Sequence, residues 1–317
     1  MREAIRLKHY SYSTEKTYID WAQRFYNYVL NEKKKNISEL NFDENDLKDF
    51  LTYLAITRRV ASSTQNQAFN ALLFLFKNIL NISVNNLGET VRAKRGPKLP
   101  VVLSTQEVQK VFAGSSGTRL LILKLIYGAG LRLMDLLRLR VKDIDFDYNT
   151  IFIRGGKGDK DRTTMLPQKI REDLIKHIEK VKALHEDDLN KGFGEVSLPN
   201  ALDIKYPNAP KELGWQYVFP SANLSVDPRS GKIKRHHLNE KTVQNAMKNA
   251  VKKAGIIKHA TVHTLRHSFA THMLMNGVNI IEIQDLLGHK NVETTMIYTH
   301  VMRDMSNAPK SPLDLLK

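Results

Sequence analysis

The residue types best suited to chemistry lie close together near the end of the chain, between positions 263 and 298. His263 and Arg266 are three positions apart, His289 follows Gly288, and Tyr298 comes nine residues later. Arginine presents a planar fork of donors that fits two phosphate oxygens, histidine exchanges protons near neutral pH, and tyrosine can act as a nucleophile. Together these residues indicate transfer of a phosphoryl group without a metal ion.

Each of these residues has an ordinary alternative when it is considered alone. A helical histidine is usually a satisfied residue, a lone arginine a solvated charge, and a lone tyrosine half-buried packing. A metal site is a further alternative, because His263 and His267 are four positions apart on one helical face. However, the segment HTLRH lacks the glutamate of a metalloprotease helix, and the chain has no cysteine. The joint pattern is therefore more specific than any single residue.

A second arginine follows a glycine-rich turn in the middle of the chain. The segment TRLLILKLIYGAG predicts a buried helix that ends in this turn, and Arg132 follows just before another predicted helix. A side chain fixed at such a point can be aimed into a cleft. The ordinary alternative is a salt bridge to Asp135. The two interpretations are compatible, because a carboxylate can orient an active-site arginine.

The elements around these residues are short helices and one hairpin. His263 begins a predicted helix, and Gly277 and Gly288 end two successive helices. The segment TIFIRGGKGDKDRTTMLP alternates apolar and polar residues on both sides of a Gly- and Asp-rich turn, which predicts a hairpin with Lys157 near its tip. A lysine at a hairpin tip is ordinarily just an exposed surface residue. Lys160 and Arg162 lie close by in the sequence, so either could be confused with Lys157 if one cation of this turn has a function.

Residues 1–88 predict a separate domain that contains only helices. Apolar residues recur at helical spacing after Ser13, the expected cap, and again after the acidic stretch 43–46. Ser62 with Gln65 predicts a capping box ahead of the apolar segment AFNALLFLFKNIL. This composition indicates a compact helical bundle.

Residues 89–100 predict a basic linker, because Gly, Pro and charged residues replace core candidates. A second domain of mixed structure, 101–317, begins with the capping box expected for Ser104 and Glu107. It contains an unusual insertion at about 184–214, which is longer than the usual connections of compact domains.

Charge is the most informative property of the composition. The 317 residues include 49 Lys and Arg against 33 Asp and Glu, a formal net charge of +16, and 16 basic and 10 acidic residues precede Pro100. Both halves are basic, which indicates a polyanionic partner such as DNA, although anionic membranes attract the same residues. No apolar run is long enough to span a bilayer, and no secretory segment begins the chain. We therefore expect a soluble cytoplasmic bacterial protein without disulfides.

The spaced motifs have a counterpart in a known family. H-x-x-R, then L-G-H, then Tyr nine residues later, together with G-L-R-x-x-D-L-x-x-L around Arg132, resemble the tyrosine recombinases, also called the phage integrase family. This family more often has Glu where Asp135 stands. The resemblance implies a mainly α fold with small β-sheets or hairpins (α+β). It also implies a helical core-binding domain and a mixed catalytic domain that form a C-shaped clamp on DNA.

The resemblance also implies roles for six residues in cutting and rejoining DNA. Arg132, Arg266 and His289 would stabilise the phosphorane, His263 would take the proton of Tyr298, and Lys157 would protonate the leaving 5′ oxygen. The product would be a 3′-phosphotyrosyl link, so that neither a cofactor nor a metal ion is required.

The insertion resembles one subgroup more closely, the integron integrases. Its segment GWQYVFPS, followed by DPRSG and RHHLNEKT, implies recombination of gene cassettes between duplex attachment sites and folded single-strand hairpin sites. Flipped bases need flat surfaces for stacking. The candidate base contacts are Trp215, Tyr217, Pro228, Arg229, His236 and His237, although core packing is equally plausible for Trp215. The resemblance further implies a homotetramer in the synaptic complex, with tails docking between subunits, and a monomeric or weakly associated free protein.

Three alternatives remain open from the sequence. The chain could be another phage-type recombinase, a non-catalytic site-specific DNA-binding protein on the same fold, or a type IB topoisomerase. The complete set of six matched residues disfavours the second alternative. The helical first domain and the insertion disfavour the third.

Overall fold

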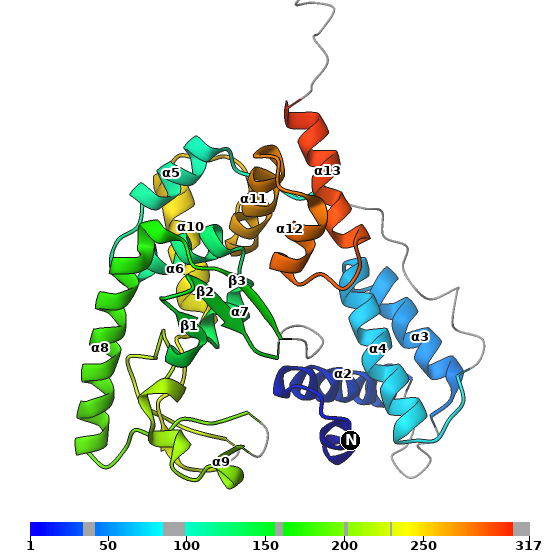
Figure 1. The fold of residues 1–317 in the computed structure, drawn as a ribbon. Helices are drawn as coiled ribbons and strands as arrows, with labels where there is room; N and C mark the ends of the chain where they lie inside the picture. Colours follow the sequence, from blue (N-terminus) through cyan, green and yellow to red (C-terminus); the bar gives the residue numbers. More distant parts are fainter. Residues whose placement is uncertain (34–41, 85–98, 156–160, 200–201, 229, 307–317) are drawn as a thin grey trace, which may run out of the picture. The chain divides into compact units, whose positions relative to one another are not determined.

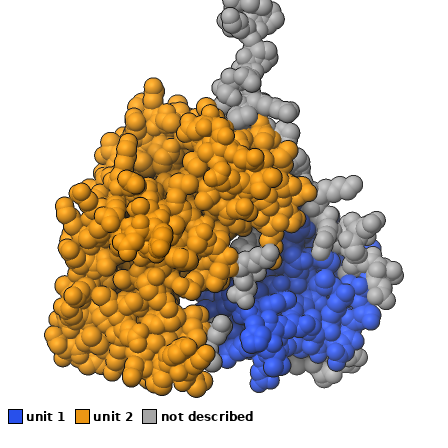
Figure 2. Space-filling model, viewed as in Figure 1, with its two compact units in different colours: residues 1–98 blue, residues 99–317 orange. Residues whose placement is uncertain are grey.

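The computed structural model describes residues 1–33, 42–84, 99–155, 161–199, 202–228 and 230–306. The chain divides into two compact units, Met1–Lys98 and Leu99–Lys317, which are coloured separately in Figure 2. Helices make up most of both units, and the second also contains two small antiparallel sheets (Figure 1). The predicted fold class, mainly α with small β elements, is confirmed. Within these described ranges, no helix is both long enough and apolar enough to cross a bilayer.

The first unit is built from helices whose starts are set by local capping. These helices are α1 (Arg2–Leu7), α2 (Tyr12–Asn31), α3 (Glu44–Ile56) and α4 (Ser62–Asn78). Ser11, and not the predicted Ser13, caps α2 by accepting a hydrogen bond from the Thr14 amide. The capping box predicted for Ser62 and Gln65 is wrong, because Ser62 is already helical and Ala61 precedes it as the N-cap.

Aromatic residues form the core of this unit. The ring of Phe25 lies 5.5 Å from that of Phe50 and 5.7 Å from that of Phe76, and all three side chains are buried. Burying one such side chain contributes about 1.5–3 kcal/mol, and Trp21 and Leu72 extend the same cluster. The first unit therefore has a hydrophobic core of its own.

The second unit begins with the predicted capping box, since Ser104 and Glu107 cap each other reciprocally. Its helices are α5 (Thr105–Ala113), α6 (Gly117–Ala129), α7 (Leu133–Leu137), α8 (Arg171–Asn190), α9 (Leu202–Lys205), α10 (Glu240–Lys253), α11 (Val262–Met275), α12 (Ile280–Leu287) and α13 (Glu293–Ser306). Its strands are β1 (Ile144–Asp145), β2 (Thr150–Ile153), β3 (Arg162–Met165), β4 (Ser225–Val226) and β5 (Ile233–Lys234).

The strands of the predicted hairpin are present, and a second pair of strands follows later in the chain. Strands β2 and β3 pair antiparallel with Ile153 opposite Arg162, and β1 extends this sheet along β2. Strands β4 and β5 pair with Val226 opposite Ile233. Lys157 and Lys160 lie outside the described residues, whereas Arg162 begins β3.

Helix α11 is the element on which the catalytic candidates depend. It packs against α6, α12 and α13. The shared cluster contains Phe269 and Ala270 of α11, Ile283 and Leu287 of α12, and Tyr298 of α13, all buried. This packing brings the last three helices together and places them against α6, which lies more than 130 positions earlier in the chain.

Candidate active site

Arg132 owes its position to the way in which α6 ends. Gly130 closes α6 with a left-handed φ of 62°, and a Cβ at this position would lie 2.5 Å from the ring of Phe269. The chain then turns, so that Arg132 becomes the extended N-cap of α7. Its guanidinium donates to the Gly288 carbonyl at 3.1 Å and lies 3.5 Å from the Asp135 carboxylate. Arg132 is therefore paired with Asp135 and also reaches the end of α12.

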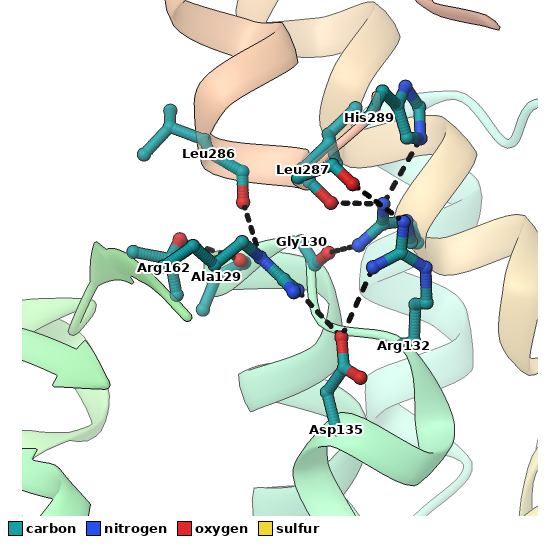
Figure 3. A network of polar contacts seen from close by, with 11 residues as sticks. Ala129, Gly130, Arg132, Asp135, Arg162, Leu286, Leu287 and His289 are labelled. Carbon is teal, nitrogen blue, oxygen red and sulfur yellow. Dashed lines mark hydrogen bonds and ion pairs between the residues drawn. The ribbon is translucent and has the colours of Figure 1, made fainter. Parts of the chain in front are cut away.

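Arg266 is held between the ends of two other helices. It is only 3% exposed. Its guanidinium donates to the carbonyl of Gly130 at 2.5 Å and to that of Leu287 at 2.7 Å. Figure 3 shows Gly130, Leu287 and His289, the residues that contact Arg266, close to Arg132. The two arginines therefore come together from different elements, Arg266 from α11 and Arg132 from the turn before α7.

A third arginine, Arg162, completes the arrangement from strand β3. It donates to the Asp135 carboxylate at 2.6 Å and to the Leu286 carbonyl at 3.3 Å (Figure 3). A Cβ on Gly288 would lie 2.6 Å from Cδ of Arg162. Arg162 therefore ties the sheet to α7 and α12, and it requires glycine at the residue before His289. Sequence reasoning treated Arg162 only as a neighbour of Lys157.

His289 follows the left-handed C-cap Gly288, as the sequence predicted. Its Nε2 lies 3.1 Å from a nitrogen of Arg266, and its Nδ1 lies 2.9 Å from the hydroxyl of Thr295. Because a guanidinium can only donate, Nε2 accepts this hydrogen bond and Nδ1 carries the proton of the neutral ring. The predicted donation from His289 to a phosphate oxygen therefore requires that the ring first gain a second proton.

The electrostatics of this group show an excess of buried positive charge. Burial, with the nearby Arg132 and Arg162, lowers the pKa of Arg266 to about 9. Burial, together with the positive charges of Arg266, Arg132 and Arg162, lowers the pKa of His289 to about 3. We call Arg132, Asp135, Arg162, Arg266 and His289 the active-site cluster. It contains three guanidinium groups and a single carboxylate, so an anion that enters it would be strongly stabilised.

Tyr298 lies beside the active-site cluster and is 1% exposed. Burial raises the pKa of its hydroxyl, while the positive charges of Arg266 and Arg132 act to lower it. Its ring stacks on that of His289, with centroids 6.4 Å apart. Its hydroxyl lies 2.9 Å from Nδ1 of His267. The phenol is therefore close enough to the two predicted arginines to feel their charge.

His263, the predicted proton acceptor, lies at an exposed position in the first turn of α11. Burial of its ring and the charges of Arg266 and Arg132 lower its pKa. The hydroxyl of Tyr298 is bonded to His267, one turn further along, and the two imidazole centroids are 6.2 Å apart. Sequence reasoning considered His267 only as a partner of His263 in a metal site. Among the residues that the structure describes, no group of three or more His, Cys, Asp or Glu side chains is placed to hold a metal ion.

Two aromatic residues of the predicted base-contact group differ in accessibility. Trp215 is half-buried, and the Lys142 ammonium lies 2.9 Å from its ring centroid. Tyr217 is 5% exposed, and the Arg140 guanidinium covers its ring at 3.6 Å. In this arrangement Tyr217 offers little exposed surface to a base, because packing and the Arg140 guanidinium surround its ring.

The histidine pair lies against this buried tyrosine. The centroids of His236 and His237 are 5.4 and 5.3 Å from that of Tyr217, and 4.0 Å from each other. His236 is exposed and His237 is half-buried, and burial lowers the pKa of His237 to about 4. Pro228 is exposed, and Arg229 lies outside the described residues. Tyr217 thus supports the histidines that remain accessible.

Comparisons with known proteins agree with this arrangement. Residues 102–304 match the phage integrase family, and residues 1–86 match the N-terminal SAM-like domain of phage integrases. An integrase/recombinase of Escherichia coli is 43% identical over 316 residues, which cover 100% of this chain and 92% of that protein. Tyrosine recombinase XerA of Thermococcus onnurineus is 33% identical over 283 residues, with 88% and 84% covered.

Solved structures share the fold. A lambda integrase dimer bound to a core site has a TM-score of 0.62 at 15% identity, covering 98% of this chain and 95% of that one. XerH recombinase, in a post-cleavage complex with its difH substrate, has a TM-score of 0.58 at 22% identity, covering 95% and 80%. With the matched motifs and the tyrosine set among arginines, these findings show that the chain belongs to the phage integrase family of tyrosine recombinases, enzymes that break and rejoin DNA.

Proposed function

We propose that this recombinase cuts a DNA strand through attack of the Tyr298 hydroxyl on a phosphodiester held by Arg132 and Arg266. The observation that carries this proposal is the burial of one phenol beside a cluster with more guanidinium than carboxylate groups. Attack produces a pentacoordinate phosphorus with added charge on its nonbridging oxygens. Aimed donors at those oxygens are often the largest contribution to catalysis.

The two protonation states of His289 fit this chemistry. The approach of a phosphodiester brings negative charge into the active-site cluster, which raises the pKa of a neighbouring imidazole. A doubly protonated His289 then keeps its bond to Thr295 and turns Nε2 into a donor for a phosphate oxygen. Lys157 is our candidate for the general acid that protonates the leaving 5′ oxygen. The resulting 3′-phosphotyrosyl link keeps the bond energy for rejoining.

The partner that fits the charge is duplex DNA. The net charge of +16 is spread over both halves of the chain, and neutralised phosphates provide most of the affinity of such proteins for DNA. Solved relatives in this family were captured on DNA sites, as the complexes of lambda integrase and XerH show for those proteins. We extend the proposal to a DNA clamp made by a core-binding domain, residues 1–88, and a catalytic domain, residues 101–317, joined by the linker 89–100.

The direct test is covalent capture of DNA. A library of duplexes with randomised flanks and a nick beside the central phosphate is incubated with the chain, and protein-linked DNA is isolated under denaturing conditions. The enriched sequence becomes the substrate for later assays. We expect an adduct with the wild-type chain and none with Tyr298→Phe.

Tyr127→Phe is the matched control. Tyr127 is a half-buried phenol whose hydroxyl, like that of Tyr298, contacts an imidazole of α11, here that of His272 at 2.8 Å. It should form the adduct normally. An adduct that persists in Tyr298→Phe, or that never forms with the wild-type chain, contradicts the proposal. Relaxation of supercoiled plasmid at unselected sites would instead favour a topoisomerase.

A second, finer function is supported by the insertion at about 184–214 and the residues after it. We propose that the chain is an integron integrase, which inserts and excises gene cassettes at hairpin sites and acts as a homotetramer in the synapse. The partly exposed Trp215, and the paired rings of His236 and His237, offer flat faces for extrahelical bases. Trp215→Ala and His237→Ala should reduce recombination of a folded hairpin site more than binding to an ordinary duplex. An equal loss on both substrates would rule out this role.

A further inference from the structure

We propose that the imidazole of His267, and not that of His263, takes the proton of the Tyr298 hydroxyl during strand cleavage, an inference that rests on the proposed function. The observation is the 2.9 Å contact between Nδ1 of His267 and the phenolic oxygen. This is hydrogen-bond distance to the atom that would attack phosphorus. His267 is therefore a candidate catalytic residue in direct contact with a reacting group.

The two partners are fixed by packing. His267 follows Arg266 on α11, and this helix packs directly against α13, which carries Tyr298. The imidazole and phenol centroids are 5.7 Å apart, so the rings are neighbours as well as their polar atoms. A base held in this way needs no rearrangement of its own before the proton moves.

The charge state of His267 suits an acceptor. Burial, with the neighbouring His263 and Arg266, lowers its pKa to about 4, so that the ring is neutral near pH 7. A neutral imidazole has one acceptor nitrogen, and a phenol that donates at 2.9 Å assigns this acceptor to Nδ1. His263 is more exposed, and the described structure contains no hydrogen bond from it to Tyr298.

The positive surroundings also explain why the base acts only with substrate. An imidazolium at His267 would be repelled by Arg266, which lies next to it in the chain and is almost fully buried. A bound phosphodiester offsets this repulsion, and the charge that develops in the transition state offsets it further. Activation of the nucleophile is thereby coupled to the arrival of the phosphate.

The step balances in both directions. In cleavage, the proton passes from Tyr298 Oη to His267 Nδ1, the O–P bond to tyrosine forms, and the P–O5′ bond breaks as the 5′ oxygen takes a proton from the general acid. In rejoining, a 5′ hydroxyl returns its proton to the deprotonated general acid as it attacks phosphorus, and the tyrosine oxygen leaves. His267 then returns the proton to that oxygen.

The same helix contains a matched pair for comparison. Nδ1 of His272 lies 2.8 Å from the hydroxyl of Tyr127, five residues beyond His267. Burial alone raises the pKa of Tyr127, whereas Arg266 and Arg132 act to lower that of Tyr298. Only the Tyr298 pair therefore has nearby cations that would stabilise a phenolate. A histidine–tyrosine contact by itself does not imply catalysis.

The test measures single-turnover cleavage of the captured, nicked duplex by His267→Ala and His267→Asn. Asparagine places an acceptor oxygen close to the position of Nδ1 but cannot take a proton at neutral pH. If His267 is the base, both variants should lose about 10²–10³-fold in cleavage rate, within the usual range for general-base catalysis. His272→Asn should stay within about threefold of wild type, and thermal denaturation of each variant confirms an equal folded fraction.

A second substrate separates the base from the general acid. A 5′-bridging phosphorothiolate has a leaving group that departs without a proton. It should restore cleavage by Lys157→Ala but leave the His267 variants slow, because Tyr298 must still lose its proton. Conversely, Tyr298→trifluorotyrosine, with a more acidic phenol, should recover part of the rate in His267→Asn.

Three results would overturn the inference while leaving the proposed function intact. Wild-type rates in His267→Asn would mean that the contact only orients the phenol. Restoration of the His267 variants by the phosphorothiolate would assign His267 to the leaving group. If trifluorotyrosine at position 298 does not raise the cleavage rate of His267→Asn, removal of the phenolic proton is not the step that this variant lacks. Failure of the wild-type chain to form any adduct would instead refute the proposed function itself.

Discussion

Two arginine sites in the second unit are built alike but differ in charge balance. Arg266 in the active-site cluster and Arg235 near the insertion are both largely buried, and each donates to two backbone carbonyls. Arg235 also holds both oxygens of Asp188, at 2.5 and 2.6 Å, and this carboxylate raises its pKa. Among the described residues no carboxylate is paired with Arg266, and its pKa is lowered to about 9.

This difference separates a structural arginine from a functional one. The Asp188–Arg235 pair is neutral and joins the end of α8 to the segment after β5, so it has no charge left for a ligand. In the active-site cluster, Asp135 is shared between Arg132 and Arg162, and Arg266 remains unbalanced. Such a site is costly for stability but ready for a phosphate. Burial alone does not identify a functional arginine. Arg266 differs from Arg235 in lacking a paired carboxylate in the described structure and in lying close to the Tyr298 phenol.

The largest expected effect comes from replacing the planar guanidinium of Arg266 or Arg235 by the single ammonium of lysine. Arg266→Lys keeps the charge but loses the paired donors, so we expect cleavage of the captured duplex to fall about 10²–10³-fold. Arg235→Lys is the matched control and should retain cleavage within a few-fold at a temperature where it is folded. Similar losses of cleavage in both variants would remove the functional distinction between the two sites.

The next effect concerns stability. Asp188→Ala leaves the buried charge of Arg235 without its partner, and we expect the free energy of unfolding of the second unit to fall by about 3–5 kcal/mol. The two tryptophans, Trp21 and Trp215, lie in different units, so urea unfolding in a Trp21→Phe background reports the second unit alone. The double variant Asp188→Leu with Arg235→Met should recover most of the loss. No recovery would mean that the pair contributes more than charge neutralisation.

A smaller effect is expected from the glycine that brings His289 close to Arg162. Gly288 has φ 62°, and its added Cβ would meet Arg162, which is held by two hydrogen bonds. Gly277 has φ 85° and no atom within 4 Å of the added Cβ. Gly277→Ala should therefore lower the free energy of unfolding only by the backbone strain, about 1–2 kcal/mol, and leave the cleavage rate normal. Gly288→Ala should lower the free energy of unfolding by more than Gly277→Ala does and slow cleavage roughly tenfold. Equal stability and equal cleavage rates in the two variants would show that the Arg162 side chain moves aside freely.

The smallest effect is on the pH dependence of stability. The folded pKa of His267 is about 4 and that of His289 about 3, below the unfolded value of about 6.5. Between pH 6.5 and these values the unfolded chain binds more protons, so stability falls as pH falls. From pH 7 to pH 5 we expect each of these two histidines, partly screened by solvent, to lower the stability of the second unit by on the order of 1 kcal/mol, seen in Trp215 fluorescence. His267→Asn should lessen this loss, and an unchanged pH dependence would contradict burial of a neutral His267.

Parts of the fold and site could be predicted because their causes are local. The glycines 130 and 288 end helices with positive φ, and Ser104 with Glu107 begins one. The hairpin strands around Lys157 follow from alternation and a Gly-rich turn. Ser62 shows the limit of such rules, because capping boxes depend on which residue first becomes helical. The burial of Tyr217 was also missed, since it depends on Arg140, 77 positions away in the chain, covering its ring.

By itself, the sequence determined which chemical groups are available: two arginines, two histidines and a tyrosine at fixed spacings, on helices that end where glycine permits. Tertiary structure decided which of these groups meet. The bond from His267 to Tyr298 spans 31 positions, and that from Arg162 to Asp135 spans 27. Such contacts arise from how α11, α13 and β3 pack, and a spacing rule describes only neighbours on one element. For this reason the sequence favoured His263 as the partner of the tyrosine, whereas packing placed His267 there.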